Sequence, residues 1–283
     1  MTIEEVITEA VLAIYGEPEL AEHVYLKDGA ALRLLEDLTT RLSMDADFSL
    51  DQPLEHPDEF FETIHQGLIR RFEAHDYDIL DFKHRRKPQK AHPDKPDWWG
   101  GWVCEFKLCP ISFRKEPLET RRRNALVPAG TTKSTIPLDI SDHEYCGTGR
   151  RKVIAGVEIH GYTRELLVLE KLRAICQQHP DYPYSKDKNR ARDFYDILQL
   201  TQEADEAFLT TCRNEIDKVF DAKEVPLTFL NALWDEQFTD TFARGFDEVR
   251  ETIRGTPYPF DIYLEHARFL VMDVLPDLAS GTV

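Results

Sequence analysis

The sequence of 283 residues is poor in cysteine and has no long apolar run. Five cysteines are an odd, sparse set, which is typical of a reducing compartment and argues against a disulfide scaffold. No apolar run approaches the roughly 20 residues that a membrane-spanning helix needs. The first residues, Met1–Glu5, are acidic and lack the basic start of a secretory signal. We therefore expect a cytoplasmic protein without a membrane partner.

Several catalytic signatures are also missing. The chain has no P-loop, no Gly-x-Gly-x-x-Gly, no Gly-x-Ser-x-Gly and no His-Glu-x-x-His, which argues against the enzyme classes that depend on them. A content of 42% hydrophobic and 31% charged residues is that of a globular protein, so a disordered or fibrous chain is excluded.

Positive charge is scarce overall but concentrated in the middle of the chain. The formal net charge is −17, which disfavours nonspecific binding to nucleic acid because phosphates are repelled at long range. Residues 83–192 nevertheless hold 23 Lys and Arg against 13 Asp and Glu, a net of +10, while the rest of the chain carries −27. A local basic region could still bind a polyanion, although clustered Lys and Arg more often form a solvated surface.

The pattern of apolar residues divides the chain into an α+β half and a helical half, with a predicted boundary between residues 155 and 156. Thr2 and Glu5 have the spacing of a capping box before a helix. The Pro- and Lys-rich segment 85–97 predicts an exposed loop. The remaining expected elements of the first half are helices over 2–15, 31–42 and 57–75, a short helix near 121–123, and strands over 43–50, 79–82, 102–108, 134–140 and 153–159.

The sharpest local feature is the pair of carboxylates in Asp45-Ala46-Asp47. On one face of a strand, two such residues lie about 6–7 Å apart at Cα, so both can converge on a divalent cation that prefers oxygen ligands. An EF-hand is excluded, because the sixth and twelfth positions of such a loop would be Leu50 and His56. The ordinary alternative is an exposed strand face that carries two acids.

The surroundings of this pair resemble a known family. A Gly turn with Ala-Leu at residues 28–32 precedes Arg41-Leu42-Ser43-Met44-Asp45-Ala46-Asp47-Phe48. This passage resembles the first motif of DNA polymerase β-type nucleotidyltransferases, and more narrowly the AbiEii/AbiGii toxin family. Later segments resemble further family motifs in the same order: Leu138-Asp139-Ile140, Glu170-Lys171-Leu172, and Arg192-Asp193-Phe194-Tyr195-Asp196. The resemblance covers about residues 24–200.

The resemblance implies a nucleotidyltransferase-like mixed β-sheet with flanking helices in residues 1–155, and a helical domain in residues 156–283 that completes the active-site cleft. It implies a Mg²⁺-dependent toxin of a toxin–antitoxin, abortive-infection or phage-defence system that transfers NMP from an NTP to an acceptor hydroxyl. The acceptor could be the tRNA 3′ end or another RNA, and a cognate antitoxin would be the protein partner. By carry-over, the catalytic residues would be Asp45, Asp47, Asp139 and Lys171, with the three aspartates as metal ligands. The nucleotide-binding residues would be Gly29, Arg41, Ser43, Lys171, Arg192, Asp193 and Asp196.

The chain departs from the family pattern at one turn, and this leaves alternatives open for its function and for its third acid. The family has Gly-Gly or Gly-Ser where this chain has Asp28-Gly29, and a small hydroxyl residue where it has Ala30. An acid at the turn would repel phosphates, so the chain could be a fold of this type that binds a partner or a nucleotide without turnover. A separate alternative is an enzyme that nucleotidylates a small molecule or a protein. Glu105 on a neighbouring strand is a rival to Asp139 as the third acid.

Other sites remain open on the sequence. Cys104, Cys109, His143 and Cys146 could form a zinc site, but their spacing is irregular and buried free cysteines are the better interpretation. The aromatic run Trp98–Trp102 could stack a base or sit in the core of a hairpin. An RNA backbone would be expected at the basic segments 84–90, 121–123, 150–152 and 186–192.

Overall fold

The structure is a computed structural model that describes residues 1–42, 45–88, 95–96, 99–184 and 188–276. The chain divides into two compact units: residues 1–37 with 43–162, and residues 38–42 with 163–283. The division after Tyr162 falls beyond the predicted boundary at 155/156, because the strand Val157–Gly161 pairs with the sheet of the first unit.

The first unit is built on one mixed β-sheet. In the part of the chain that the structure describes, seven strands lie in the order β3-β4-β5-β2-β1-β7-β6. Pairs β2/β5 and β1/β7 are parallel and the other neighbours are antiparallel. The strands are β1 (Val24–Lys27), β2 (Ala46–Leu50), β3 (Tyr77–Lys87), β4 (Gly101–Pro110), β5 (Ile136–Ser141), β6 (Arg150–Ile154) and β7 (Val157–Gly161). The expected α+β class with a mixed sheet is therefore confirmed.

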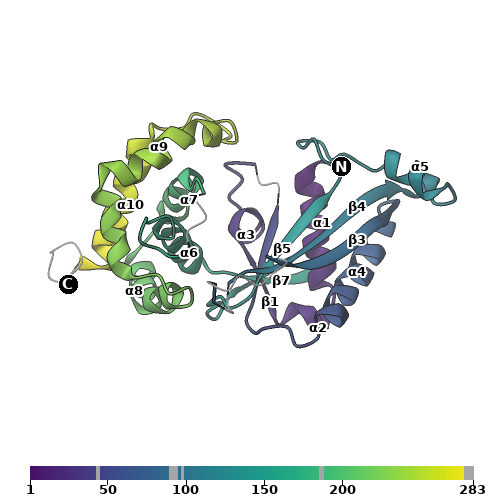
Figure 1. The fold of residues 1–283 in the computed structure, drawn as a ribbon, viewed down its shortest axis with the longest axis horizontal. Helices are drawn as coiled ribbons and strands as arrows, with labels where there is room; N and C mark the ends of the chain where they lie inside the picture. Colours follow the sequence, from purple (N-terminus) through teal and green to yellow (C-terminus); the bar gives the residue numbers. More distant parts are fainter. Residues whose placement is uncertain (43–44, 89–94, 97–98, 185–187, 277–283) are drawn as a thin grey trace. The chain divides into compact units, whose positions relative to one another are not determined.

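Two long helices cover one face of this sheet, as Figure 1 shows. Helix α1 (Ile3–Tyr15) begins as the sequence predicts, since the Thr2 hydroxyl accepts from the Glu5 amide and the Glu5 carboxylate accepts from the Thr2 amide. Helix α4 (Pro57–Glu73) starts at a proline and buries its apolar stripe. The other helical segments of this unit are α2 (Pro18–Ala21), α3 (Asp28–Leu34), η1 (Ile111–Phe113) and α5 (Leu118–Arg123).

Three local predictions are wrong. The strand expected over 153–159 is instead two antiparallel strands, β6 and β7, with Ile154 opposite Val157 across the turn between them. The helix expected over 31–42 is instead α3, which begins at Asp28 and ends at Leu34. Residues 38–42 belong to the second unit, where the Leu42 amide donates to the Thr252 carbonyl and the Arg254 amide donates to the Thr40 carbonyl. Residues 85–87, expected in a loop, extend β3, because their backbone pairs with β4 as far as Lys87 opposite Gly101.

The second unit is helical, as predicted. Helix α6 begins after the cap Thr163, whose hydroxyl accepts from the Leu166 amide. The helical elements of the second unit are α6 (Arg164–Cys176), α7 (Ala191–Thr201), α8 (Glu206–Asp221), η2 (Leu227–Trp234), α9 (Glu236–Arg250) and α10 (Phe260–Val274). None of the described helices, in either unit, has both the length and the apolar character needed to cross a bilayer.

Candidate functional site

A row of charged side chains crosses the middle of the sheet. In the parallel pair β2/β5, Asp47 lies directly opposite Asp139. In the antiparallel pair β1/β2, Lys27 lies directly opposite Asp47. Neighbouring strands are about 4.8 Å apart, so these three residues of distant sequence become immediate neighbours. Asp45 comes directly before β2 and is partly exposed. The structure therefore brings the predicted acids of the first unit together.

The period-two pattern of β2 explains which face carries this row. Ala46, Phe48 and Leu50 are fully or almost fully buried, and the Phe48 ring lies 6.5 Å from the Tyr15 ring of helix α1. Successive strand residues point to opposite faces, so Asp47 points away from the helices. On β5, Leu138 and Ile140 are buried in the same way.

Asp47 lies in an acidic row that it forms with Asp45 and Asp139, and its pKa responds to these neighbours. The pKa of Asp47 is well above its usual range, first because the carboxylate is desolvated, and then because Asp28, Asp45 and Asp139 add negative charge nearby. Lys27 opposes this effect and lowers the pKa. Carboxylates that repel one another in this way are favourable ligands for a divalent cation, which removes the repulsion.

The donor set suits a hard cation such as Mg²⁺, because carboxylate oxygens are its preferred protein ligands. As the side chains stand, no three His, Cys, Asp or Glu residues in the described part of the chain surround one point closely enough to hold a metal ion. At Asp139, Oδ1 accepts from Lys87 Nζ at 3.0 Å. A metal ion that takes Asp139 as a ligand would compete with Lys87 for this carboxylate.

Glu105, the rival third acid, lies on β4 opposite Pro137. Strand β5 separates β4 from β2, so Glu105 is one strand further from Asp47 than Asp139 is. Its carboxylate is paired with Lys83 at 2.9 Å and with Arg85 at 3.5 Å, and these cations lower its pKa. The arrangement favours Asp139 as the third acid.

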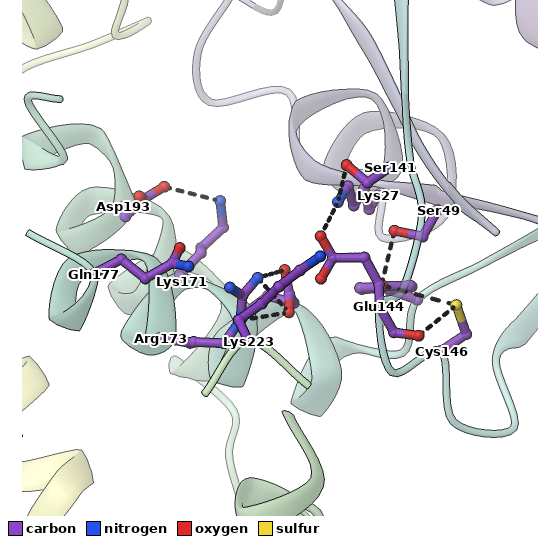
Figure 2. Close-up of polar contacts among 12 residues, drawn as sticks. Lys27, Ser49, Ser141, Glu144, Cys146, Lys171, Arg173, Gln177, Asp193 and Lys223 are labelled. Atoms are coloured by element: carbon purple, nitrogen blue, oxygen red, sulfur yellow. Dashed lines mark hydrogen bonds and ion pairs between the residues drawn. The ribbon is translucent and has the colours of Figure 1, made fainter. Parts of the chain in front are cut away.

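Lys27 is a residue that the sequence reasoning missed. It is 7% exposed, and its Nζ donates to Ser141 Oγ at 3.2 Å and lies 3.5 Å from Glu144 Oε1 (Figure 2). A buried lysine beside paired acids is a strong signal of a functional site. The signal depends on strand register, so it is not visible in the sequence.

The second unit gathers the other predicted charged residues. Asp196 on α7 is 1% exposed and receives two hydrogen bonds from Arg41, Nε to Oδ1 and Nη2 to Oδ2, both at 2.7 Å. Lys171 on α6 is 2% exposed, and its Nζ donates to Asp196 Oδ2 at 2.8 Å. The same Nζ lies 3.4 Å from Asp193 Oδ1, as Figure 2 shows. Asp193 and Asp196 are three residues apart on one helix, so they share a face.

Charge balance decides the ionisation of Asp196. Burial raises the pKa of this carboxyl group, but Lys171 and Arg41 outweigh burial and hold the pKa below its usual range. Arg192, a predicted nucleotide contact, is exposed, and the partners of Asp196 are Arg41 and Lys171. Ser43, another predicted nucleotide contact, lies outside the described residues.

The turn that departs from the family pattern has a distinct backbone. Asp28 has φ of 53°, a left-handed conformation that Asp adopts more readily than most residues. Gly29 and Ala30 are buried at the start of α3, a helix of seven residues. Asp28 is also the first of the charged groups that raise the pKa of Asp47, so its carboxylate adds to the acidic row.

The structure also locates residues of the alternative zinc site and of the alternative base-stacking site. All five cysteines are free and buried, as expected from their spacing, and burial raises the pKa of Cys104 and Cys176. Trp102 packs on Phe61 of α4 with ring centroids 5.5 Å apart, so this residue of the aromatic run belongs to the hairpin core. Trp98 lies outside the described residues.

Acids of the first unit neutralise many of the basic side chains that were expected to bind RNA. Salt bridges join Arg121 to Asp78 at 3.2 Å and Arg150 to Glu36 at 2.6 Å. Further pairs are Arg122–Asp81 at 2.7 Å, Arg151–Glu158 at 2.7 Å and Lys152–Asp37 at 2.7 Å. The net of +10 in the middle of the sequence therefore overstates the positive charge that this unit presents.

Comparison with solved structures finds chains that align along most of this one. JHP933 from Helicobacter pylori is 15% identical, with a TM-score of 0.44, and the alignment covers 99% of this chain and 93% of that chain. The nucleotidyltransferase toxin MenT4 from Mycobacterium tuberculosis is 12% identical, with a TM-score of 0.44, and the alignment covers 96% of this chain and 91% of that chain. No curated protein sequence matches this chain.

A family model described as the nucleotidyl transferase AbiEii toxin of a type IV toxin–antitoxin system matches residues 10–266. The match includes both halves of the chain, the acidic row on the sheet and the buried cluster around Asp196. The chain therefore belongs to the AbiEii nucleotidyl transferase toxin family.

Proposed function

We propose that this chain is a Mg²⁺-dependent nucleotidyltransferase toxin that moves a nucleoside monophosphate from an NTP to an acceptor hydroxyl. The acceptor oxygen forms a bond to the α-phosphorus, the bond from that phosphorus to the leaving pyrophosphate breaks, and a carboxylate takes the hydroxyl proton. The observation that carries the proposal is the direct register of Asp47 and Asp139 on neighbouring strands.

Each charged group has a role in this scheme. Asp45, Asp47 and Asp139 would hold Mg²⁺, which when bound neutralises charge on the triphosphate. Asp139 is the foremost candidate to accept the proton from the acceptor. Lys171 and Arg41 are proposed to bind triphosphate oxygens, with Asp193 and Asp196 orienting Lys171. Gly29, Ser43 and Arg192 stay predicted nucleotide contacts.

The proposal is tested by incubating the purified chain with α-³²P-labelled NTPs, Mg²⁺ and total RNA, and separately with protein extract or small-molecule acceptors. Label in RNA, with tRNA as the first fraction to examine, is the expected result. Asp139→Asn should lower the rate about a hundredfold or more, because the amide cannot accept the hydroxyl proton and general-base catalysis typically contributes about that much. Glu105→Gln is the matched control and should retain activity. If no label reaches any acceptor, the active-enzyme proposal fails.

Family membership also motivates a partner and a cellular effect. The chain belongs to a family of type IV toxin–antitoxin systems, so we propose a cognate antitoxin as its partner. Expression of the wild-type chain should arrest growth of its host, co-expression of the antitoxin should restore growth, and Asp47→Asn should be harmless. Arrest by Asp47→Asn at equal protein level would separate toxicity from transfer.

One observation favours a second candidate function, in which the chain binds a partner or a nucleotide without turnover. Asp28 stands at the turn where the family has glycine, and its charge adds to the acids around Asp47. A carboxylate there would repel triphosphate. The double change Asp28→Gly with Ala30→Ser should then increase NTP affinity in calorimetry. Tight NTP binding by the wild type with Mg²⁺ would remove the basis of this candidate.

A further inference from the structure

Two lysines flank the acidic row, and they differ in how firmly they are held. Lys27 is buried and anchored by Ser141 and Glu144. Lys87 is the last residue of β3, and its side chain is 59% exposed. Its Nζ lies 3.0 Å from Asp139 Oδ1. An exposed ion pair of this kind is weak and exchanges readily with other cations.

The strand register explains how Lys87 reaches across β4. Lys87 lies opposite Gly101, and Gly101 lies opposite Ser141, so the three residues share one line across the sheet. Asp139 lies two residues before Ser141 and therefore points to the same face. Gly101 has no side chain, so nothing at this position of β4 blocks the long lysine side chain.

We propose that Lys87 is an internal counter-ion of Asp139 that a divalent cation displaces when it binds the acidic row. The inference rests on the proposed function, since it takes Asp139 as a metal ligand. The ammonium group offsets the negative charge of the row before the cation arrives. A divalent cation carries twice the charge and takes carboxylate oxygens as direct ligands, so it replaces the lysine. Lys87 is therefore a positioning residue that sets how tightly the row binds its cation.

The same strand provides a matched control. Lys83 is 62% exposed and pairs with Glu105 at 2.9 Å, so it resembles Lys87 in strand, exposure and ion-pair length. Its partner Glu105 is separated from Asp47 by strand β5. Loss of the charge at Lys83 should leave cation binding to the row unchanged.

The experiment measures binding of Mg²⁺ alone, and of Mn²⁺ alone, to the full chain by isothermal titration calorimetry at low ionic strength. Lys87→Met should bind either ion about three to ten times more tightly than the wild type, because a repelling charge a few ångströms from the ion is removed. Lys87→Arg keeps the charge and should bind as the wild type does. Lys83→Met should also match the wild type. Thermal unfolding of each variant without metal confirms that it is folded.

The outcomes separate this inference from the proposed function. If the wild type binds Mg²⁺ and Asp47→Asn does not, the metal site stands, and equal or weaker binding by Lys87→Met overturns the counter-ion. If Lys83→Met binds more tightly and Lys87→Met does not, Glu105 is the third ligand and the inference is wrong. If the wild type binds neither ion, the metal-dependent proposal itself fails, and the counter-ion fails with it.

Discussion

Replacement of Asp196 by Asn tests the charge balance of the second unit most directly. Asp196 is 1% exposed and is the shared partner of Arg41 and Lys171, which are 8% and 2% exposed. The amide keeps the shape of the carboxylate but removes its charge. Two buried cations then lose their shared anion, while Asp193 remains 3.4 Å from Lys171.

The expected loss of stability follows from the burial of Asp196 and its two cationic partners. Removing one partner of a buried ion pair typically costs about 3–5 kcal/mol. A chain of this size loses about 3 °C in Tm per kcal/mol, so Asp196→Asn should lower the Tm by about 9–15 °C. Differential scanning calorimetry at pH 7 measures this directly.

The acid limb of the stability profile gives an independent check. The pKa of Asp196 in the folded protein is lowered, so below the ordinary Asp pKa of about 3.9 the unfolded chain binds this proton more readily than the folded protein. The stability from Asp196 is complete above that pH and is lost as the pH falls through the lowered value. Asp196→Asn should lack this part of the acid-induced loss.

Two changes on the same helix act as controls. Asp193→Asn removes longer contacts, 3.4 Å to Lys171 and 3.5 Å to Arg190, and should cost less than Asp196→Asn. Arg192→Ala is exposed and should change the free energy of unfolding by no more than about 0.5 kcal/mol. A Tm for Asp196→Asn within about 3 °C of the wild type would refute the buried-cluster reasoning.

Four further predictions concern the first unit, the nucleotide and the partners. Asp47→Asn should abolish transfer yet stabilise the fold. The gain in free energy of unfolding should be larger at pH 8 than at pH 5, because the raised pKa of Asp47 means that wild-type stability falls as the pH rises above the ordinary Asp pKa. Calorimetry at both pH values checks this. Lys171→Met should raise the KM for the NTP, and an unchanged KM would argue against a triphosphate contact. The buried cysteines should react slowly with Ellman's reagent until denaturant is added, since burial raises the pKa of Cys104 and Cys176; fast labelling of either would contradict their burial. A complex of the acidic toxin with a basic antitoxin should weaken when salt is raised from about 50 to about 300 mM, and salt-insensitive binding would count against a charge-driven contact.

The sequence by itself determined the class of fold and most of its elements. The capping box at Thr2 and Glu5 is local chemistry, and it places the start of α1 correctly. The alternation around Asp47 predicts a strand with one apolar and one polar face, and β2 has this form, with Ala46, Phe48 and Leu50 on one face and Asp47 and Ser49 on the other. Patterns of this kind are visible because helix and strand periodicity depend on neighbouring residues. The family resemblance likewise follows from motifs in the sequence, and the family model confirms it.

Strand register and long-range ion pairing were decided only by the tertiary structure. No spacing in the sequence shows that Asp139 lies beside Asp47, or that Lys27 and Lys87 flank them, because these residues meet through the strand order β3-β4-β5-β2-β1. The sequence predicts a helix through the segment 38–42, because it continues a stretch of helix-forming residues and its distant partners are not visible in the sequence. Its backbone pairs with residues 252–254, which lie about 210 positions further along the chain. Local helix propensity is weaker than such tertiary contacts, and these contacts bring Arg41 into its ion pair with Asp196.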